Sequence, residues 1–440
     1  MNEFFDILKI KDCIRDLLKE SKNKNEDERL ILKSQINSLL NYPSNVLEYL
    51  FRYYYEINSD TKHYLYEQGC KNWFIKIFGI REQDYDTTKK LFTFIKTNIP
   101  VRGKGYINKL IAPNGNMYDV GEFSTPTLSE IRKIAINILL IKPSEYNVYM
   151  PKEEPLIVIE DLIVEDILTN HIEFPDATIQ AASQFNALEF VGPDVTPKDG
   201  ITNYKNDPTQ GPACALACAA GTFVRNYFYQ TPEEQINYLD EFEKAIKNKE
   251  NKYFEIKNGY LMLIGTTQKQ KKQKLANLNK YLTELCKPEN IDEYNKLKNL
   301  IKIGLHQNVE IIFKNRFELV DKKGKTINQV YAAALPIAYN NIGDDPNWQN
   351  FATLILEAQY EATLLSAIKN VNNDVILTFV GGGAFGNKKE WIFNAIVTAI
   401  KEVKKIRNKN FQIKLNIKIG QFRNKDSIIN KNELDLALKN

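Results

Sequence analysis

The stretch from Val375 to Asn387 has the residue types that can bind a phosphate group. Six residues suited to a buried strand lead into three glycines (381–383), and another glycine follows at Gly386. Residues 391–406 then place apolar side chains on one face of an expected helix. A strand, a glycine-rich turn and a helix present backbone N–H groups to an anion, and glycine permits the positive φ that such turns use. The alternative is a tight strand-to-helix turn without a ligand.

Two common nucleotide-binding signatures do not fit this loop. Gly381 and Gly386 have the separation of the P-loop glycines, but Asn387 follows where that motif needs Lys and then a hydroxyl residue. Gly381, Gly383 and Gly386 satisfy the Rossmann spacing, but no acidic residue closes a following strand about twenty residues on. The sequence therefore argues against an NTP hydrolase and against a Rossmann domain.

Candidate acid–base residues lie in the polar loop 194–210. Asp207 stands directly before Pro208-Thr-Gln-Gly-Pro212, at the entrance to a glycine-containing turn, and Asp199 precedes it in the same loop. A carboxylate there can act as a general base or orient a substrate, so Asp207 is the first candidate and Asp199 another. Single aspartates in loops also serve as turn or cap residues.

A second acidic pair, Asp344 and Asp345, lies before Trp348. Both are candidate catalytic residues because the loop that holds them can border the same cleft. Asp345-Pro346 is also a helix-start signal, which is the alternative interpretation.

No metal site is expected from the sequence. Cys214 and Cys218 are four residues apart without a His or further Cys nearby, whereas structural zinc takes four ligands. Glu357 and Glu361 align on an expected helix but lack His partners. The five scattered cysteines do not make a disulfide framework, which favours a reducing compartment.

The composition excludes several classes of partner. The chain has 440 residues, 26% of them charged, and a net charge of +4. A nucleic-acid-binding domain is usually strongly basic, so no nucleic-acid partner is expected. No apolar run reaches membrane-spanning length, and the N-terminus lacks the order of a signal peptide. We therefore expect a soluble, cytoplasmic protein without a membrane partner.

The hydrophobic pattern predicts two regions. Residues 1–148 are expected to be mostly helical, with a capping box at Thr127-Leu-Ser-Glu130. A proline-bounded link covers 143–155. From residue 156 strands alternate with helices, which predicts a three-layer α/β domain whose ligand lies beyond the carboxyl ends of the strands. The main expected strands and helices are strands at 156–159, 177–180, 260–264, 309–313, 317–320, 329–337, 375–380 and 412–419, and helices at 213–229 and 351–369.

Residues 156–420 resemble the macrodomain superfamily, whose members bind ADP-ribose and often cleave it from proteins. The family pattern corresponds here to Glu165-Asp166-Ile167, to 176–183, and to Gln210-Gly211-Pro212 leading into an Ala/Cys-rich helix. The triple-glycine loop with its flanking helices resembles the family's second phosphate loop. The resemblance is nearest to a divergent branch that includes the Legionella effector MavL and eukaryotic relatives. It implies a macrodomain-like mixed sheet with a helical insertion at about 230–300 and a tail at 421–440.

The resemblance also implies roles for individual residues. Asp166 and the Ile167 backbone would hold the adenine, and Gln184 or Asn186 would contact the distal ribose. The chain has Gln-Ala-Ala-Ser where the family has Asn-Ala-Ala-Asn, which leaves the ribose residue open between these two. Phe385 would cover the distal ribose. The implied ADP-ribose site consists of Asp166, Ile167, Gln184, Asn186, Gly211, Gly381, Gly382, Gly383, Ala384, Phe385, Gly386 and Asn387.

Three functions stay open at this point. An ADP-ribosylhydrolase needs a carboxylate or oriented water near the ribose C1 carbon, where an oxocarbenium-like state develops. The acidic loop favours this enzyme, without metal or cofactor, with ADP-ribose as ligand and product. A non-catalytic reader of ADP-ribose is the alternative, and a scaffold with an empty pocket the third. The expected partner is an ADP-ribosylated protein, with ubiquitin or a host protein as candidates if the chain is secreted into a host cell as an effector.

Overall fold

The computed structural model describes residues 73–97, 100–101, 105–140, 157–164, 166–207, 209–315, 318–320, 324–369, 374–406, 415–422 and 431–439. The helical segments expected before residue 73 and the proline-bounded link at 143–155 lie outside these ranges.

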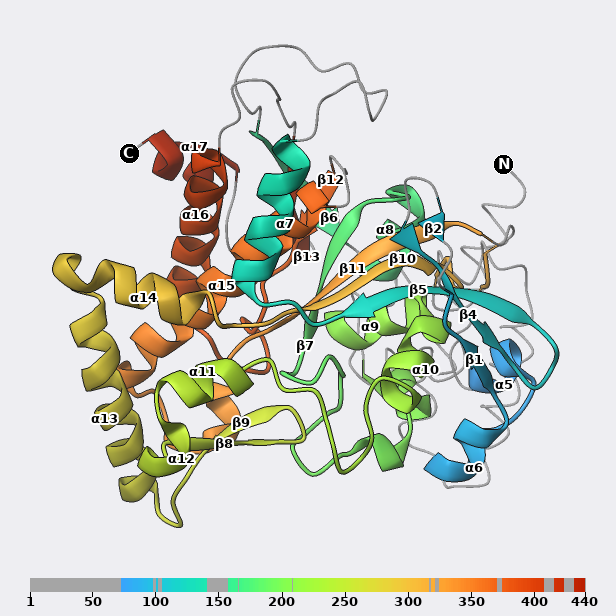
Figure 1. Cartoon of the computed structure of the whole chain (residues 1–440), viewed down its shortest axis with the longest axis horizontal. Helices are drawn as coiled ribbons and strands as arrows, with labels where there is room; N and C mark the ends of the chain where they lie inside the picture. The colour runs from blue at the N-terminus through green and yellow to red at the C-terminus, as the bar shows by residue number, and fades with distance from the viewer. Residues whose placement is uncertain are drawn as a thin grey trace, which may run out of the picture.

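A nine-stranded mixed sheet forms the centre of the molecule (Figure 1). Five neighbouring strands, from β11 to β6 in the spatial order, run parallel, and the four strands on the β1 side pair antiparallel. The spatial order is β1 (Thr93–Ile95), β4 (Asn108–Ile111), β5 (Met117–Ser124), β10 (Gly304–Glu310), β11 (Thr326–Ala333), β7 (Thr178–Ser183), β12 (Asp374–Leu377), β13 (Leu415–Phe422) and β6 (Ile157–Val164).

Helices cover both faces of the parallel strands, which is the three-layer α/β arrangement predicted from the sequence. On one face α15 (Gln349–Lys369) packs on β11 and beside α7 (Leu128–Leu140) and α16 (Lys389–Lys405). On the other face α8 (Ile167–Glu173) packs on α9 (Gln210–Ala217), which packs on β7. Figure 1 shows these two helical groups on opposite sides of the sheet.

The central strand β11 is buried along its whole length, its polar residues included. All eight residues of β11 are buried, because helices cover both of its faces. Its polar members are satisfied inside the protein: Gln329 donates to the Cys214 carbonyl (2.8 Å) on the α9 side. The core therefore extends through the sheet into both helical layers.

The region at 230–300 is a largely helical insertion, as expected. It contains a β-hairpin between its helices, and its last two helices lie at one edge of the molecule. Its elements are α11 (Asp240–Ala245), α12 (Asn248–Asn251), β8 (Phe254–Lys257), β9 (Tyr260–Leu263), α13 (Gln268–Leu285), the short helix η4 (Pro288–Asn290) and α14 (Ile291–Lys298).

The structure differs from the expected mostly helical N-terminal region over residues 93–124. β1, β4 and β5 extend the main sheet, and β5 pairs with β10, almost two hundred residues later in the chain. That pairing overrides local helical preference. The remaining elements here are α5 (Trp73–Phe78), α6 (Tyr85–Lys90) and the hairpin of β2 (Pro100–Val101) and β3 (Gly105–Tyr106).

Other expected elements are found with adjusted bounds. The capping box is confirmed, since Thr127 N–H donates to Glu130 Oε2 (2.8 Å) and Glu130 N–H to Thr127 Oγ1 (3.2 Å). The single helix expected at 213–229 is two helices, α9 and α10 (Ala219–Tyr227), broken at Cys218. The expected strand at 317–320 begins outside the described residues, and Leu319 bridges to Phe313.

The C-terminal segment is more than a tail. α17 (Lys431–Lys439) packs on α16 and β6, and its Leu434 is fully buried. Within the described ranges, no helix is both long and apolar enough to span a membrane.

Candidate functional site

A cavity of about 210 Å³ lies beyond the carboxyl ends of β7, β11 and β12. It is where an open α/β sheet is expected to bind its ligand. Three loops meet there: the one after β7, the one that enters α9, and the triple-glycine loop after β12. The predicted site residues that line this cavity are Gln184, Asp207, Gly211, Gly381, Gly383, Ala384 and Phe385.

Gln210 fixes the start of α9 against the end of β7. The Ala182 N–H donates to Gln210 Oε1 (2.7 Å), and Gln210 Nε2 donates to the Gln180 carbonyl (2.7 Å). At Gly211 a Cβ would lie 2.2 Å from the Ala182 carbonyl oxygen, so only glycine fits this approach. The first turn of α9 is therefore held directly at the cavity wall.

The first turn of α9 offers backbone donors to the cavity. The helix begins at Gln210, so the N–H groups of Gln210 and Gly211 have no acceptor within the helix. Thr209, the N-cap residue, makes no side-chain capping bond to them. The cavity is lined by Thr209, Gln210 and Gly211, so the positive end of the helix dipole faces it.

The glycine-rich loop holds itself in shape by internal hydrogen bonds. The N–H of Gly382 donates to Phe379, that of Gly386 to Gly383 (3.0 Å), and that of Asn387 to Gly381 (2.9 Å). Gly381 and Gly386 both have a φ of 77°, the left-handed region that favours glycine. The N–H groups of Gly382, Gly386 and Asn387 are thus used within the loop rather than offered to a ligand.

Three consecutive N–H groups are left at the tip of this loop. Among the described residues, the N–H groups of Gly383, Ala384 and Phe385 have no acceptor, and all three residues line the cavity. Asn387 supports the tip from behind, because its Nδ2 donates to the Leu335 carbonyl (2.8 Å). The cavity is therefore bordered by two sets of backbone donors, one from α9 and one from this tip.

Among the candidate acidic residues, the structure brings only Asp207 to the cavity. The Thr209 N–H donates to Asp207 Oδ1 (2.8 Å), which fixes the carboxylate at the entrance to α9. Burial of the phenol raises the pKa of Tyr260, and the charge of the nearby Asp207 adds to that rise.

The other three candidate aspartates lie outside the cavity lining and act as local caps or ion-pair partners. Asp199 closes a capping box with Thr196, whose N–H donates to Asp199 Oδ2 (2.8 Å). Asp344 pairs with Lys388 (3.0 Å). Asp345 caps the short helix η6 (Pro346–Trp348) by accepting from the Asn347 N–H (3.0 Å). For Asp199 and Asp345 the structure shows the cap role that was the alternative interpretation, whereas Asp344 is an ion-pair partner.

The two candidate ribose residues are both tied into the loop 184–190. Gln184 lines the cavity, but its Nε2 donates to the Phe190 carbonyl (2.9 Å) and its Oε1 accepts from the Phe190 N–H (2.9 Å). Asn186 is fully buried and donates to Gln235 Oε1 (2.8 Å). Gln184 is part of the cavity wall, whereas Asn186 lies outside the cavity lining and is bonded to Gln235 and the Leu188 N–H.

The candidate adenine residues lie at the start of α8, outside the cavity lining. Asp166 caps the helix by accepting from the Leu168 N–H (3.1 Å). The Ile167 carbonyl lies 2.8 Å from His171 Nδ1, and Ile167 itself is buried. α8 packs on α9, so these residues support the helix that borders the cavity.

Sequence reasoning missed Glu189, which is 2% exposed, lines the cavity and lies next to Gly211. Its carboxylate is 3.5 Å from the Arg225 guanidinium, and Arg225 is fully buried. Burial raises the pKa of Glu189 to about 8, and the Arg225 charge opposes that rise. A glutamate inside the apolar run 187–190 was the available signal.

Sequence reasoning named Phe385 but missed the two tyrosines that join it in an aromatic cluster at the cavity. The rings of Tyr260, Tyr339 and Phe385 come from β9, the short helix η5 (Ile337–Asn340) and the glycine-rich loop, and all three residues line the cavity. Tyr260 is 5.0 Å from Tyr339 and 5.6 Å from Phe385, between ring centroids. The insertion therefore contributes an aromatic wall to the site.

The carboxylates and thiols considered as metal ligands have other surroundings. Lys298 lies 3.7 Å from Glu357 and 3.5 Å from Glu361, and Arg132 pairs with Glu361. Cys214 and Cys218 are buried free thiols in α9 and at its end. Over the part of the chain that the structure describes, no three His, Cys, Asp or Glu side chains are placed to hold a metal.

Comparison with known proteins finds similarity only at the level of solved structures. No family model matches the chain, and no curated protein matches it. The chain is similar to poly(ADP-ribose) glycohydrolase from Thermomonospora curvata at 9% identity and a TM-score of 0.37, over 75% of this chain and 92% of that one. It is also similar to the enzyme of that name from Deinococcus radiodurans in complex with ADP-ribose, at 9% identity and a TM-score of 0.35, over 72% and 92% of the two chains.

Proposed function

We propose that the cavity binds ADP-ribose and that the protein removes ADP-ribose from modified proteins. The observation that carries the proposal is the meeting of two sets of backbone N–H groups, at the start of α9 and at Gly383–Phe385, on one cavity that Asp207 also lines. A diphosphate offers many acceptors and is bound well by such donors. Among the described residues that line the cavity there is no lysine or arginine, so backbone N–H groups would bind the phosphates.

The reaction assigned to this site is hydrolysis at the ribose C1 carbon. Water forms a bond to C1 while the bond from C1 to the protein side chain breaks, the departing group takes a proton from bulk water, and the proton that Asp207 accepts is returned to bulk water. Asp207 accepts the proton of the attacking water and its charge stabilises the oxocarbenium-like state. The Thr209 N–H holds the Asp207 carboxylate at one oxygen, which orients it for this role.

The aromatic cluster supports the same assignment. Phe385 and Tyr339 present ring surfaces to the cavity beside the glycine-rich tip, where a ribose or a base can pack. In this proposal the reaction uses a carboxylate and backbone donors and needs no metal or cofactor. Hydrolysis that proceeds unchanged in the presence of a metal chelator is the expected result. ADP-ribosylated ubiquitin and other ADP-ribosylated host proteins are the first substrates to assay.

A release assay on ADP-ribosylated protein tests the proposed reaction. Wild type is expected to release free ADP-ribose, and Asp207→Asn is expected to lower the rate by roughly a hundredfold or more while ADP-ribose affinity stays within a few-fold. Asp199→Asn is the matched control, since Asp199 only caps a short helix, and its rate should equal that of wild type. Binding without release by wild type would instead support the reader function, and an unaffected Asp207→Asn would remove Asp207 from the mechanism.

A further inference from the structure

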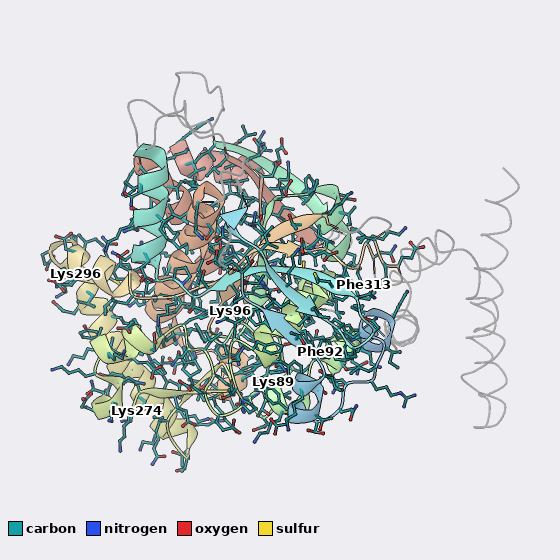
Figure 2. The ribbon with its side chains drawn as sticks, turned by 45° about the vertical axis from the view of Figure 1, so that its right-hand side comes forward. Lys89, Phe92, Lys96, Lys274, Lys296 and Phe313 are labelled. Carbon is teal, nitrogen blue, oxygen red and sulfur yellow. The ribbon has the colours of Figure 1, made fainter. Side chains whose placement is uncertain are left out.

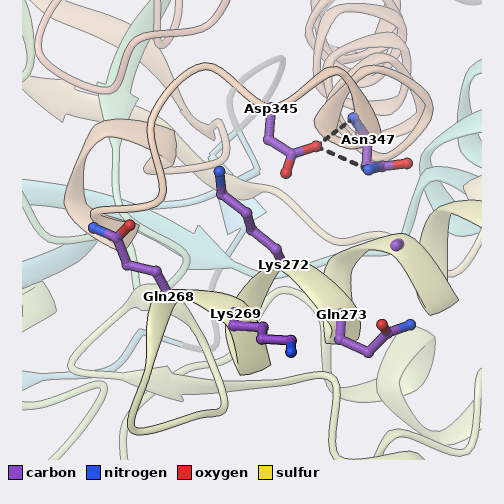
Figure 3. Close-up of a pocket in the computed structure, with 7 residues that line it drawn as sticks. Gln268, Lys269, Lys272, Gln273, Asp345 and Asn347 are labelled. Atoms are coloured by element: carbon purple, nitrogen blue, oxygen red, sulfur yellow. Dashed lines mark hydrogen bonds between the residues drawn. The ribbon is translucent and has the colours of Figure 1, made fainter.

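A second cavity, of about 460 Å³, lies between the start of α13 and the loop around η6 (Figure 3). Its walls are polar, and Figure 3 shows Lys272 reaching from α13 toward the loop that holds Asp345 and Asn347. The polar residues that line it are Gln268, Lys269, Lys272, Gln273, Asp345 and Asn347.

α13 carries an unusual excess of positive charge. The helix has five lysines and one glutamate, and four of the lysines fall within 269–274, its first two turns. No acidic residue stands in its first turn. Lysines at a helix N-terminus face the positive end of the helix dipole and each other, which opposes helix stability. The arrangement is therefore not explained by folding of the helix alone.

Two of these four lysines donate hydrogen bonds to backbone carbonyls, and the other two are exposed on the surface. Lys271 donates to the Asn340 carbonyl (3.4 Å) and Lys274 to the Asn251 carbonyl (2.7 Å). Lys269 and Lys272 are exposed and, among the described residues, have no acidic partner. The carboxylate at the rim, Asp345, is engaged by the Asn347 backbone N–H and side-chain amide. The cavity thus presents two exposed ammonium groups beside neutral amides and one carboxylate, which is hydrogen-bonded to Asn347.

This basic surface lies next to the proposed ADP-ribose cavity. Tyr339 lines the first cavity and Asp345 lines the second, and six residues of extended chain span at most about 22 Å. Lys271 contacts Asn340, the neighbour of Tyr339. Figure 2 shows Lys274 on the insertion side of the molecule, away from Phe92 and Phe313 at the other end. A protein held on this surface could therefore present an attached ADP-ribose to the first cavity.

We propose that Lys269 and Lys272 form a docking surface for an acidic segment of the ADP-ribosylated protein. This proposal rests on the proposed function and adds the chemistry of the substrate protein. Exposed lysines attract carboxylates over about a Debye length, so docking speeds association and weakens as salt rises. Substrates with glutamates or aspartates near the modified residue are the ones this surface selects.

The test compares two pairs of charge-reversed variants of the full chain. Lys269→Glu with Lys272→Glu removes the docking surface. Lys249→Glu with Lys90→Glu makes the same change of charge at exposed lysines elsewhere, on α12 and α6. The probes are a labelled glutamate oligomer without ADP-ribose, a glutamine oligomer of the same length, and a single-stranded RNA of matched charge. Binding is measured by fluorescence anisotropy at low and at about 0.15 M ionic strength.

The proposal predicts that wild type and the control pair bind the glutamate oligomer equally, and that the α13 pair binds it roughly tenfold more weakly. Equal binding by the two pairs, no preference for glutamate over glutamine, or a preference for RNA would overturn it. Because these probes lack ADP-ribose, the result does not depend on the first cavity. Failure of the proposed function is detected separately, by absence of ADP-ribose binding to all variants.

Discussion

At the scale of single residues, Gly383 decides whether a phosphate can approach the tip of the glycine-rich loop. A Cβ built at Gly383 meets no atom within 4 Å, and its φ lies outside the left-handed region. A side chain is therefore compatible with the fold, so this position separates binding from stability.

We predict that Gly383→Glu abolishes ADP-ribose binding while the melting temperature stays near that of wild type. The carboxylate would occupy the phosphate position with bulk and like charge. Gly383→Ala is the matched control and should bind within a few-fold of wild type. Gly381→Ala should behave differently and lose stability, because its Cβ would lie 2.4 Å from that of Ala334 at a φ of 77°. Full binding by Gly383→Glu in calorimetry would remove the phosphate role of the loop.

Glu189 makes the stability of the protein depend on pH. Burial raises its pKa to about 8 from the ordinary value of 4.5, so between these values the folded state holds a proton that the unfolded state has lost. The contribution of Glu189 to stability is thus fully present below pH 4.5 and is lost as pH rises through about 8. The buried His306 and His171, with pKa values lowered to about 3 and 4, act in the opposite sense at low pH.

We predict that Glu189→Gln removes this decline, because glutamine keeps the size of the side chain and does not titrate. The free energy of unfolding, measured with denaturant from about pH 5 to about pH 8, should fall with pH in wild type more steeply than in the variant. The histidines are common to both proteins, so the difference between the two curves isolates Glu189. Parallel curves would show that Arg225 keeps Glu189 ionised throughout.

The role of one acidic residue could be predicted from the sequence, whereas the roles of the others could not. Asp207 was recognisable because it adjoins a glycine-containing turn, and the structure brings it to the cavity. Asp199 and Asp345 have the same local signature but cap short helices. Glu189 depends on Arg225, which the chain brings to it only after folding, so its role could not be predicted from local sequence.

At the scale of elements, the site depends on how α9 is fixed to β7. Gln210 makes this attachment through both ends of its amide, to the Ala182 N–H and the Gln180 carbonyl. The donors of the first α9 turn are oriented only as long as these bonds hold.

We predict that Gln210→Ala weakens ADP-ribose binding by roughly tenfold and lowers the free energy of unfolding by about 1–3 kcal/mol, because both strand groups lose their partner near a buried wall. Gln273→Ala on α13 is the control, since Gln273 bonds only to Asn277 on an exposed helix face. Calorimetry and denaturant unfolding measure the two effects. Unchanged affinity in Gln210→Ala would mean that the α9 donors do not contact the ligand.

Elements with strong local signals were predictable and those with distant partners were not. β12, its glycine-rich loop and α16 form one continuous stretch whose apolar run, glycines and helical face are visible in sequence. β1 and β4 are short, and the longer β5 is a strand because β10 pairs with it. The hairpin that supplies Tyr260 was visible as a strand, but its position over the cavity depends on tertiary packing.

At the scale of the whole molecule, the sheet joins regions that the sequence divides at about residue 150. A chain that begins at residue 156 would lack β5 and expose the β10 edge with Leu305 and Val309, which are fully buried in the intact protein. We predict that this truncated chain aggregates or remains unfolded, whereas the full chain folds cooperatively. Circular dichroism and size-exclusion chromatography distinguish the outcomes. A soluble, cooperatively folded product from residue 156 would show that the C-terminal region is an independent domain.

The central claim is that the cavity binds ADP-ribose, and isothermal titration calorimetry of the full chain with ADP-ribose tests it most directly. We predict one site of micromolar affinity in wild type and no measurable binding in Gly383→Glu, with both proteins folded. No heat of binding at millimolar ADP-ribose in folded wild type would contradict the claim, and the hydrolase and reader functions would fall together.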